Sequence, residues 1–224
     1  MPASESIGLV IFDCDGVLVD SERLSIHVDR RVLADLGWQL SVEQIVDRFV
    51  GRSAAHFRSE VEAHLGRTLP DDWEAPYQGW YVEAFERDLV AVPGVSAAID
   101  AIDGPICVGS SGSHAKIRRN LGLTGLLPHF EGRIFSADDV EHGKPAPDLF
   151  LHAAARMGVE PSRCVVVEDS RPGVEAARAA GMRVIGYGSG MTSPHRLEQA
   201  GATVVLDMAE LPGVLRRLSS PAGD

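Results

Sequence analysis

The chain has 224 residues, a formal net charge of −11 at pH 7 and a sequence isoelectric point near 5.1. Hydrophobic residues make up 45% and charged residues 24%, which is ordinary for a soluble globular protein and excludes the disordered and fibrous classes. The acidic balance argues against non-specific binding to nucleic acid or to an anionic membrane, because both would repel the chain. We therefore expect neither as a partner.

The sequence indicates neither a targeting segment nor a disulfide framework. Residues 1–6 lack the basic stretch and apolar core of a signal peptide, and no run approaches the roughly 18 apolar residues of a membrane-spanning helix. The three cysteines, Cys14, Cys107 and Cys164, are far apart and lie in or beside apolar runs. We expect a cytoplasmic protein with three buried free thiols.

The first predicted element is a buried strand over residues 7–12, which ends in Asp13-Cys14-Asp15-Gly16. Side chains alternate faces along a strand, so Asp13 and Asp15 project to one side and Cys14 to the other. Two carboxylates so close repel each other unless a metal ion or a lysine neutralises them. Gly16 permits a sharp turn out of the strand. From this tetrapeptide alone, a loop of turn-forming residues is as good an interpretation as a functional site.

Residues 19–92 contain no convincing strand. Apolar residues recur through this segment at helical spacing, at Leu24, Val28, Val32, Leu36, Ile45, Phe49, Ala54, Phe57 and Val61. A segment this long is not an ordinary connection in a compact domain. We predict a helical domain over 19–92, inserted into a core formed by residues 1–18 and 93–224. Hinge strands are expected near residues 17–20 and 90–93, with a turn at Pro93-Gly94.

The remainder of the chain alternates short apolar runs with helical segments, which is typical of a parallel sheet. Together with the first strand, the runs are Ile7–Phe12, Ile106–Gly109, Arg133–Ser136, Cys164–Val167, Arg183–Tyr187 and Thr203–Leu206. Helices are expected to start at Ser113, Pro147 and Ser170 and to stop at Gly181 and Gly201. The predicted fold class is α/β, a doubly wound, Rossmann-like core with an inserted helical cap.

Polar residues follow three of these strands, and the carboxyl ends of parallel strands meet at one edge of a sheet. Besides the carboxylate pair, the clusters are Gly109-Ser110-Ser111-Gly112 and Glu168-Asp169-Ser170. A fourth element, Gly143-Lys144-Pro145-Ala146-Pro147-Asp148, places a lysine in a stiff turn before a helix. Helix capping and a solvated lysine would also account for these residues singly. Their convergence favours a functional site.

This set of residues suits phosphoryl transfer. A divalent ion held by Asp13, Asp169 and a backbone carbonyl would let an anionic phosphate approach, and Mg²⁺ fits because it takes one or two carboxylates and keeps several waters. Ser110 and Lys144 would bind the phosphoryl oxygens.

The two carboxylates of the first strand can take different parts in such a reaction. Asp13 could attack phosphorus as a nucleophile. Asp15 could protonate the leaving alcohol and then deprotonate water. Backbone N–H groups of Ser111 and Gly112, at a helix N-terminus, would add contacts to the phosphate.

The motifs resemble those of the haloacid dehalogenase superfamily, in the β-phosphoglucomutase-like group with a helical cap after the first strand. The resemblance covers essentially the whole chain and rests on three forms in the family's order: D-x-D-G-x-L-x-D-S-E from Asp13, G-K-P-x-P-D from Gly143 and E-D-S from Glu168. It implies that Asp13 is the nucleophile and Asp15 the general acid and base. It also implies that the Asp15 carbonyl and Asp169 bind Mg²⁺ and that Glu168 supports the metal through water.

The resulting expectations are as follows. The catalytic residues are Asp13, Asp15, Ser110 and Lys144, and the metal-binding residues are Asp13, Asp15, Glu168 and Asp169. Substrate or phosphate is bound by Gly16, Ser110, Ser111, Gly112, Lys144 and a cap loop with Gly51 and Arg52. We predict a Mg²⁺-dependent phosphatase of a small sugar, polyol or sugar-acid phosphate, acting as a monomer or weak homodimer.

Three other functions remain open on the sequence. A sugar phosphomutase is the first alternative, but the resemblance would then imply a histidine where Ser25 stands and an arginine where Ala54 stands. A dehalogenase would need neither Mg²⁺ nor an acid at position 15. A non-catalytic sensor of phosphorylated metabolites is disfavoured because every catalytic position is filled.

Overall fold

The computed structural model describes residues 6–49 and 54–219. The chain divides into two compact units. We call Ser21–Leu89 the helical unit, and the residues before Ser21 together with those from Val90 onward the sheet unit. The predicted insertion, 19–92, starts two residues earlier and ends three residues later than the helical unit.

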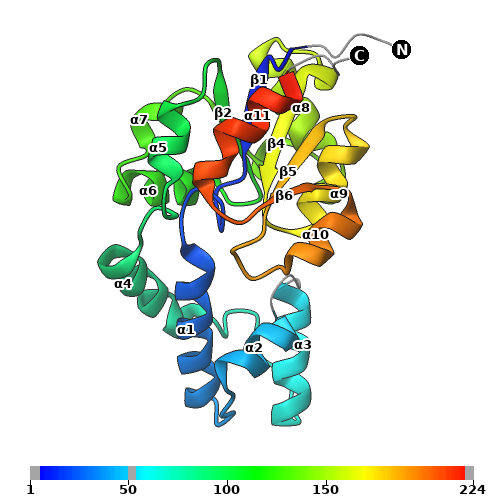
Figure 1. Cartoon of the computed structure of the whole chain (residues 1–224). Coiled ribbons are helices and arrows are strands. Elements are labelled where there is room, and N and C mark those ends of the chain that lie inside the picture. Colours follow the sequence, from blue (N-terminus) through cyan, green and yellow to red (C-terminus); the bar gives the residue numbers. More distant parts are fainter. Residues whose placement is uncertain (1–5, 50–53, 220–224) are drawn as a thin grey trace. The chain divides into compact units, whose positions relative to one another are not determined.

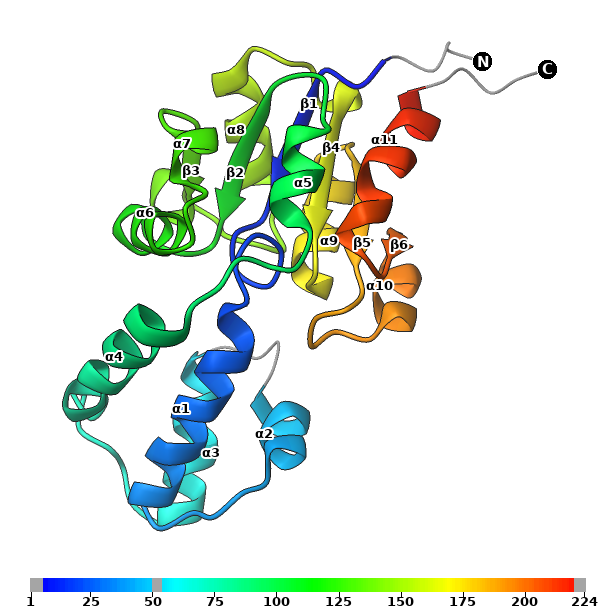
Figure 2. The same ribbon diagram turned by 60° about the vertical axis from the view of Figure 1, so that its left-hand side comes forward.

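The sheet unit is built on six parallel strands in the order β3-β2-β1-β4-β5-β6 (Figure 1; β3 is labelled in Figure 2). The strands are β1 (Leu9–Phe12), β2 (Ile106–Ser110), β3 (Ile134–Ser136), β4 (Cys164–Glu168), β5 (Arg183–Tyr187) and β6 (Thr203–Val205). Each coincides with or overlaps a predicted apolar run, so the predicted α/β fold with a parallel sheet is confirmed. After β1 the chain adds β2 and β3 toward one edge of the sheet, and from β4 it adds β5 and β6 toward the other edge. The boundary between β1 and β4 is therefore a topological switch point, where ligands bind in open sheets.

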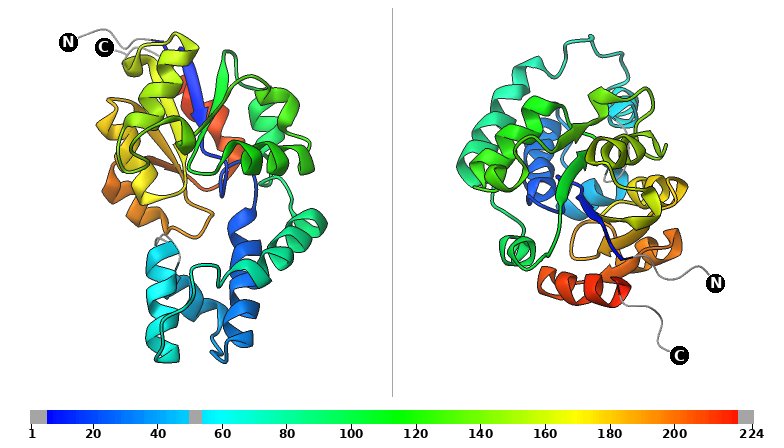
Figure 3. Two further views of the ribbon diagram at one scale, coloured as in Figure 1. Left: turned by 180° about the vertical axis from the view of Figure 1, so that it is seen from behind. Right: turned by 90° about the horizontal axis from the view of Figure 1, so that it is seen from above.

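Helices cover both faces of this sheet, which explains why its strands are apolar almost throughout (Figures 2 and 3). α8 (Asp148–Met157) and α9 (Arg171–Ala179) lie on one face, and α5 (Val95–Asp100) and α11 (Leu211–Ser219) lie on the other. Against the α8 side, Leu9 and Ile11 of β1 pack with Phe150. The remaining helices of the unit are α6 (His114–Leu123), α7 (Leu127–Phe130) and α10 (Pro194–Ala200).

The predicted helix starts and stops agree with the structure, including Gly181, which follows the C-cap of α9 with a φ of 74°. Ser113 and Ser170 are N-caps whose hydroxyls accept hydrogen bonds from the N–H groups of Lys116 and Gly173, and Pro147 is the N-cap of α8. Gly201 ends α10 in the left-handed conformation, with a φ of 101°. The cysteines are also as predicted, because Cys14, Cys107 and Cys164 are buried free thiols.

Two short segments of the sheet unit pair with each other where the chain leaves it and returns. Val19 and Ala91 form an antiparallel bridge. The N–H of Asp20 donates to the carbonyl of Val90 over 3.0 Å, and that of Val92 donates to the carbonyl of Leu18 over 3.0 Å. This pairing agrees with the two short strands predicted near residues 17–20 and 90–93.

The helical unit consists of α1 (Ser21–Asp35), α2 (Val42–Phe49), α3 (Ala54–Leu65) and α4 (Gln78–Asp88). The predicted apolar face of α1 is buried at Leu24, Val28 and Val32. α1 packs on α2 and α4. The hydroxyl of Tyr81 donates to Asp29, and burial raises the pKa of Asp29 to about 6.

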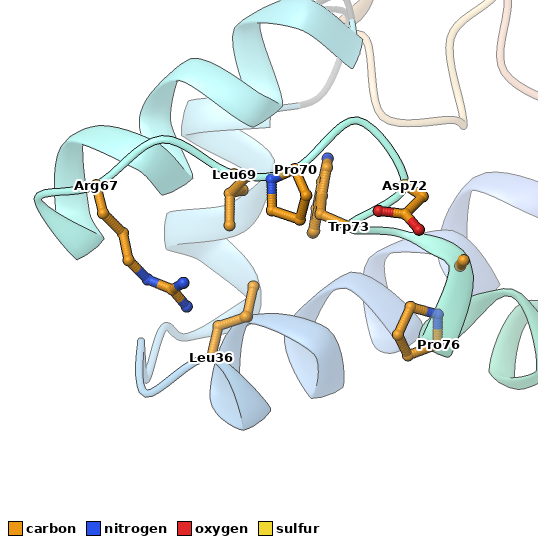
Figure 4. Close-up of a pocket in the computed structure, with 8 residues that line it drawn as sticks. Leu36, Arg67, Leu69, Pro70, Asp72, Trp73 and Pro76 are labelled. Atoms are coloured by element: carbon orange, nitrogen blue, oxygen red, sulfur yellow. The ribbon is translucent and has the colours of Figure 1, made fainter.

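A cavity of about 330 Å³ lies within the helical unit (Figure 4). Its lining is largely apolar, with Leu36, Leu69, Trp73 and two prolines, and it also includes Arg67 and Asp72. None of the predicted site residues that the structure describes lines it. Among the described residues, no helix is both long enough and apolar enough to cross a membrane.

Candidate active site

Asp13 and Asp15 lie in the turn at the carboxyl end of β1, at the switch point of the sheet. The register pairs Phe12 with Val167 of β4 and with Val108 of β2, so Asp13 emerges between these two strands. Asp13 is 7% exposed. The thiol of Cys14 between the two carboxylates is buried, and burial raises its pKa, which keeps it a neutral thiol.

Lys144 links β1 to β4 through two short ion pairs. Its Nζ lies 2.6 Å from Oδ1 of Asp13 and 2.7 Å from Oε1 of Glu168. The three side chains are 5%, 9% and 1% exposed, so these charges are almost out of contact with water. The sequence predicted that a stiff turn holds Lys144 in place, and these ion pairs agree with that prediction. The simultaneous pairing with Asp13 and Glu168 was not predicted.

Burial and charge act against each other in this group. Burial raises the pKa of Asp13 to about 7, against the lowering influence of the Lys144 ammonium, while Glu168 and Asp15 raise it further. Burial disfavours the charged form of Lys144, but the carboxylates of Asp13 and Glu168 outweigh it and hold the pKa of Lys144 above its ordinary value. Lys144 is therefore a permanent ammonium beside Asp13.

Glu168 is fixed by the start of α9 as well as by Lys144. Its Oε2 accepts hydrogen bonds from the N–H and the hydroxyl of Ser170, over 2.7 and 2.8 Å. A Cβ at Gly173 would lie 1.8 Å from Oε1 of Glu168, so this carboxylate lies directly against the helix backbone. A side chain at position 173 would displace a carboxylate that already makes three hydrogen bonds.

Asp169 reaches the turn that follows Asp15. It is 3% exposed, and a Cβ at Gly16 would lie 2.0 Å from its Oδ2. Gly16 has a φ of 76°, which also favours glycine. The turn at Gly16 therefore leaves room for the Asp169 carboxylate at the carboxyl end of β1.

The predicted phosphate loop lies at the end of β2, the strand beside β1. Ser110 is 1% exposed, and its Oγ accepts a hydrogen bond from the N–H of Gly112 over 3.3 Å. The hydroxyl of Ser136, at the end of β3, donates to the carbonyl of Gly112 over 2.6 Å. Ser111 follows Ser110 in the same loop and is exposed. Ser136 was not predicted as a site residue, and only the three-dimensional pairing of β2 with β3 reveals it.

The structure also adds Lys116 to the site. Its Nζ lies 2.7 Å from Oδ2 of Asp15. Lys116 is in the first turn of α6, where the helix dipole disfavours a cation. That unfavourable placement is the sequence signal that could have identified it. Two other predicted residues, Gly51 and Arg52, lie outside the described residues.

The residues at this edge suit a magnesium ion. Among the described residues, four carboxylates gather here with the ammonium groups of Lys116 and Lys144, and they belong to Asp13, Asp15, Glu168 and Asp169. The donors are oxygens, which Mg²⁺ prefers. Within residues 6–49 and 54–219, no three His, Cys, Asp or Glu side chains form a ready metal-binding group. Mg²⁺ is commonly held by one or two carboxylates, with water or phosphate oxygens completing its shell, and the carboxylates at this edge fit that pattern.

Comparison with known proteins agrees with this geometry. The family described as haloacid dehalogenase-like hydrolase matches residues 7–181. The chain belongs to this family. The predicted family resemblance is thus confirmed, and the protein is a hydrolase of the haloacid dehalogenase-like type.

Two curated relatives come from Escherichia coli. A 6-phosphogluconate phosphatase is 32% identical over 209 residues, covering 92% of this chain and 93% of its own. A fructose-1-phosphate phosphatase, YqaB, is 32% identical over 178 residues, covering 79% of this chain and 94% of its own.

Two solved structures extend the likeness to the whole fold. A conserved haloacid dehalogenase-like protein of unknown function from Agrobacterium tumefaciens has a TM-score of 0.87 and 39% identity, covering 96% of this chain and 100% of its own. A putative β-phosphoglucomutase from Thermotoga maritima has a TM-score of 0.80 and 27% identity, covering 94% and 99%.

Proposed function

We propose that this haloacid dehalogenase-like hydrolase is a Mg²⁺-dependent phosphatase of a small sugar, polyol or sugar-acid phosphate, and that it acts through a phosphorylated Asp13. The observation that carries the proposal is the buried ammonium of Lys144, fixed 2.6 Å from Asp13, with the second carboxylate of Asp15 two residues on. The activities named for the two Escherichia coli relatives support this substrate class.

Hydrolysis would proceed in two steps. A carboxylate oxygen of Asp13 attacks phosphorus, the bond from phosphorus to the ester oxygen breaks, and Asp15 gives its proton to that oxygen so that the alcohol leaves. Asp15 then takes a proton from water, the resulting hydroxide attacks phosphorus, and the bond to Asp13 breaks. Inorganic phosphate leaves with both aspartates restored.

The surrounding residues would hold the phosphoryl group and its charge. Lys144 and the Ser110 hydroxyl would bind its oxygens, and the backbone N–H of Ser111 would add a further donor, whereas the N–H of Gly112 already donates to Oγ of Ser110. Asp13, Asp169 and the Asp15 carbonyl would hold Mg²⁺, with Glu168 supporting it through water. When bound, the ion supplies positive charge that lets the anionic ester approach and stabilises the charge of the transition state.

The experiment is phosphate release from p-nitrophenyl phosphate by the purified protein with Mg²⁺. We expect turnover that stops on addition of EDTA and returns with excess Mg²⁺. 6-Phosphogluconate, fructose 1-phosphate and glycerol phosphate are then compared by kcat/KM, to find the leaving group that the enzyme prefers.

Two results would overturn the proposal. A protein that is folded and loaded with Mg²⁺ but inert toward every one of these esters is not a phosphatase. Interconversion of hexose phosphates without release of phosphate would instead establish a phosphomutase.

A further inference from the structure

Asp15 is held by a side chain from a helix that is 101 residues away in the sequence. The ammonium of Lys116, in the first turn of α6, lies 2.7 Å from Oδ2 of Asp15. The Asp15 side chain is 27% exposed and that of Lys116 is 44% exposed. Exposed ion pairs contribute only about 0–1 kcal/mol to stability, so stabilisation of the fold does not account for this contact.

Lys116 makes contacts at its backbone and along its alkyl chain as well as at its ammonium. Its backbone N–H donates to Oγ of Ser113, the N-cap of α6, over 3.4 Å. Its alkyl chain passes over Gly112, where a Cβ would lie 3.3 Å from Cδ of Lys116. The absence of a side chain at Gly112 therefore gives the lysine a direct path toward Asp15.

Each of the two catalytic carboxylates is paired with a different lysine. Lys144 forms ion pairs with Asp13 and Glu168, whereas Lys116 forms an ion pair with Asp15. A carboxylate in a turn can rotate about two side-chain bonds, and proton transfer requires it within hydrogen-bond reach of the reacting oxygen. A fixed ammonium on Oδ2 restricts that rotation.

We propose that Lys116 is a positioning residue that holds the carboxylate of Asp15 in the orientation from which it exchanges protons with the leaving oxygen and with water. The proposal rests on the proposed phosphatase function and adds to it a residue that acts on proton transfer, not on binding of the phosphate. Loss of Lys116 should therefore matter most for esters whose leaving group needs a proton.

The test compares two esters of similar size that differ in this need. Phenolate is a poor leaving group that requires protonation, whereas p-nitrophenolate leaves readily without it. kcat/KM is measured for phenyl phosphate and for p-nitrophenyl phosphate, because it reports the step in which the alcohol leaves. The variants are Lys116→Met, which keeps the alkyl chain over Gly112, and Lys116→Arg, which restores a cation.

We expect Lys116→Met to lower kcat/KM about tenfold more for phenyl phosphate than for p-nitrophenyl phosphate, since general acid catalysis contributes about 10²–10⁴-fold in all. Lys116→Arg should recover part of this selective loss. Arg119→Met is the matched control, because it removes one exposed cation from the same helix. It should leave the ratio of the two substrates unchanged.

The outcomes separate this proposal from the phosphatase proposal. Wild-type protein that hydrolyses neither ester contradicts the phosphatase function itself. Active wild-type protein with equal losses for the two esters in Lys116→Met, or with no loss, overturns the role of Lys116 alone. An equal loss would mean that Lys116 acts on binding or on the fold.

Discussion

Asp13→Asn is expected to lower kcat for p-nitrophenyl phosphate by about 10⁴-fold or more, because an amide oxygen is a far weaker nucleophile than a carboxylate. The fold should persist. Asparagine has nearly the same shape, and its amide oxygen can still accept a hydrogen bond from Lys144. The Lys144 ammonium also keeps its ion pair with Glu168 at 2.7 Å. Steady-state rates and circular dichroism check the two parts of this prediction.

Asp100→Asn is a suitable control for Asp13→Asn, since Asp100 is an exposed carboxylate on α5. It should retain the wild-type rate. If Asp13→Asn kept a tenth of the wild-type kcat, Asp13 could not be the nucleophile.

Lys144→Met is expected to lower the free energy of unfolding by about 3–5 kcal/mol and to abolish activity, because it leaves two buried carboxylates without their cation. Asp13 and Glu168 have side chains that are 9% and 1% exposed, so water cannot replace the ammonium. Urea denaturation measures the loss. Lys116→Met is the comparison, and we expect it to cost at most about 1 kcal/mol, because the ion pair of Lys116 is exposed.

The loss in Lys144→Met should depend on pH in a definite direction. Removal of the ammonium raises the folded-state pKa of the buried Asp13 carboxyl further above its value in the unfolded chain. As the pH rises, the unfolded state therefore loses this proton first. Stability is then lost as pH rises, and the deficit should be larger at about pH 8 than at about pH 5. A deficit that is equal at both values, or below about 1 kcal/mol, would show that Lys144 does not neutralise buried carboxylates.

Much of the fold could be predicted because its signals are local. Apolar runs such as Cys164–Val167 are short and uninterrupted, as strands covered on both faces must be, and the strand observed there, Cys164–Glu168, extends one residue further. Ser113 and Ser170 mark helix starts through capping chemistry that depends only on neighbouring residues. The convergence of strand ends followed from the parallel sheet alone.

The pairing within the site could not be predicted, because it joins residues far apart in the sequence. Asp13 and Lys144 are 131 residues apart, and nothing local shows that one ammonium bridges Asp13 and Glu168. Lys116 was overlooked because a lysine on a helix is ordinarily a solvated surface residue. Ser136 was considered only as the end of a strand, whereas its hydroxyl supports the loop at Gly112.

The proposed transfer of the phosphoryl group to Asp13 can be tested by trapping the phosphorylated form of Asp13. Asp15→Asn should still be phosphorylated by p-nitrophenyl phosphate, whose leaving group needs no proton, but should be slow to activate water for the second step. Rapid acid quenching should show an initial burst of one p-nitrophenol molecule per protein molecule. Mass analysis of peptides from the quenched protein should show a phosphoryl group on the peptide that contains Asp13. Continued turnover with that peptide unmodified would contradict the account.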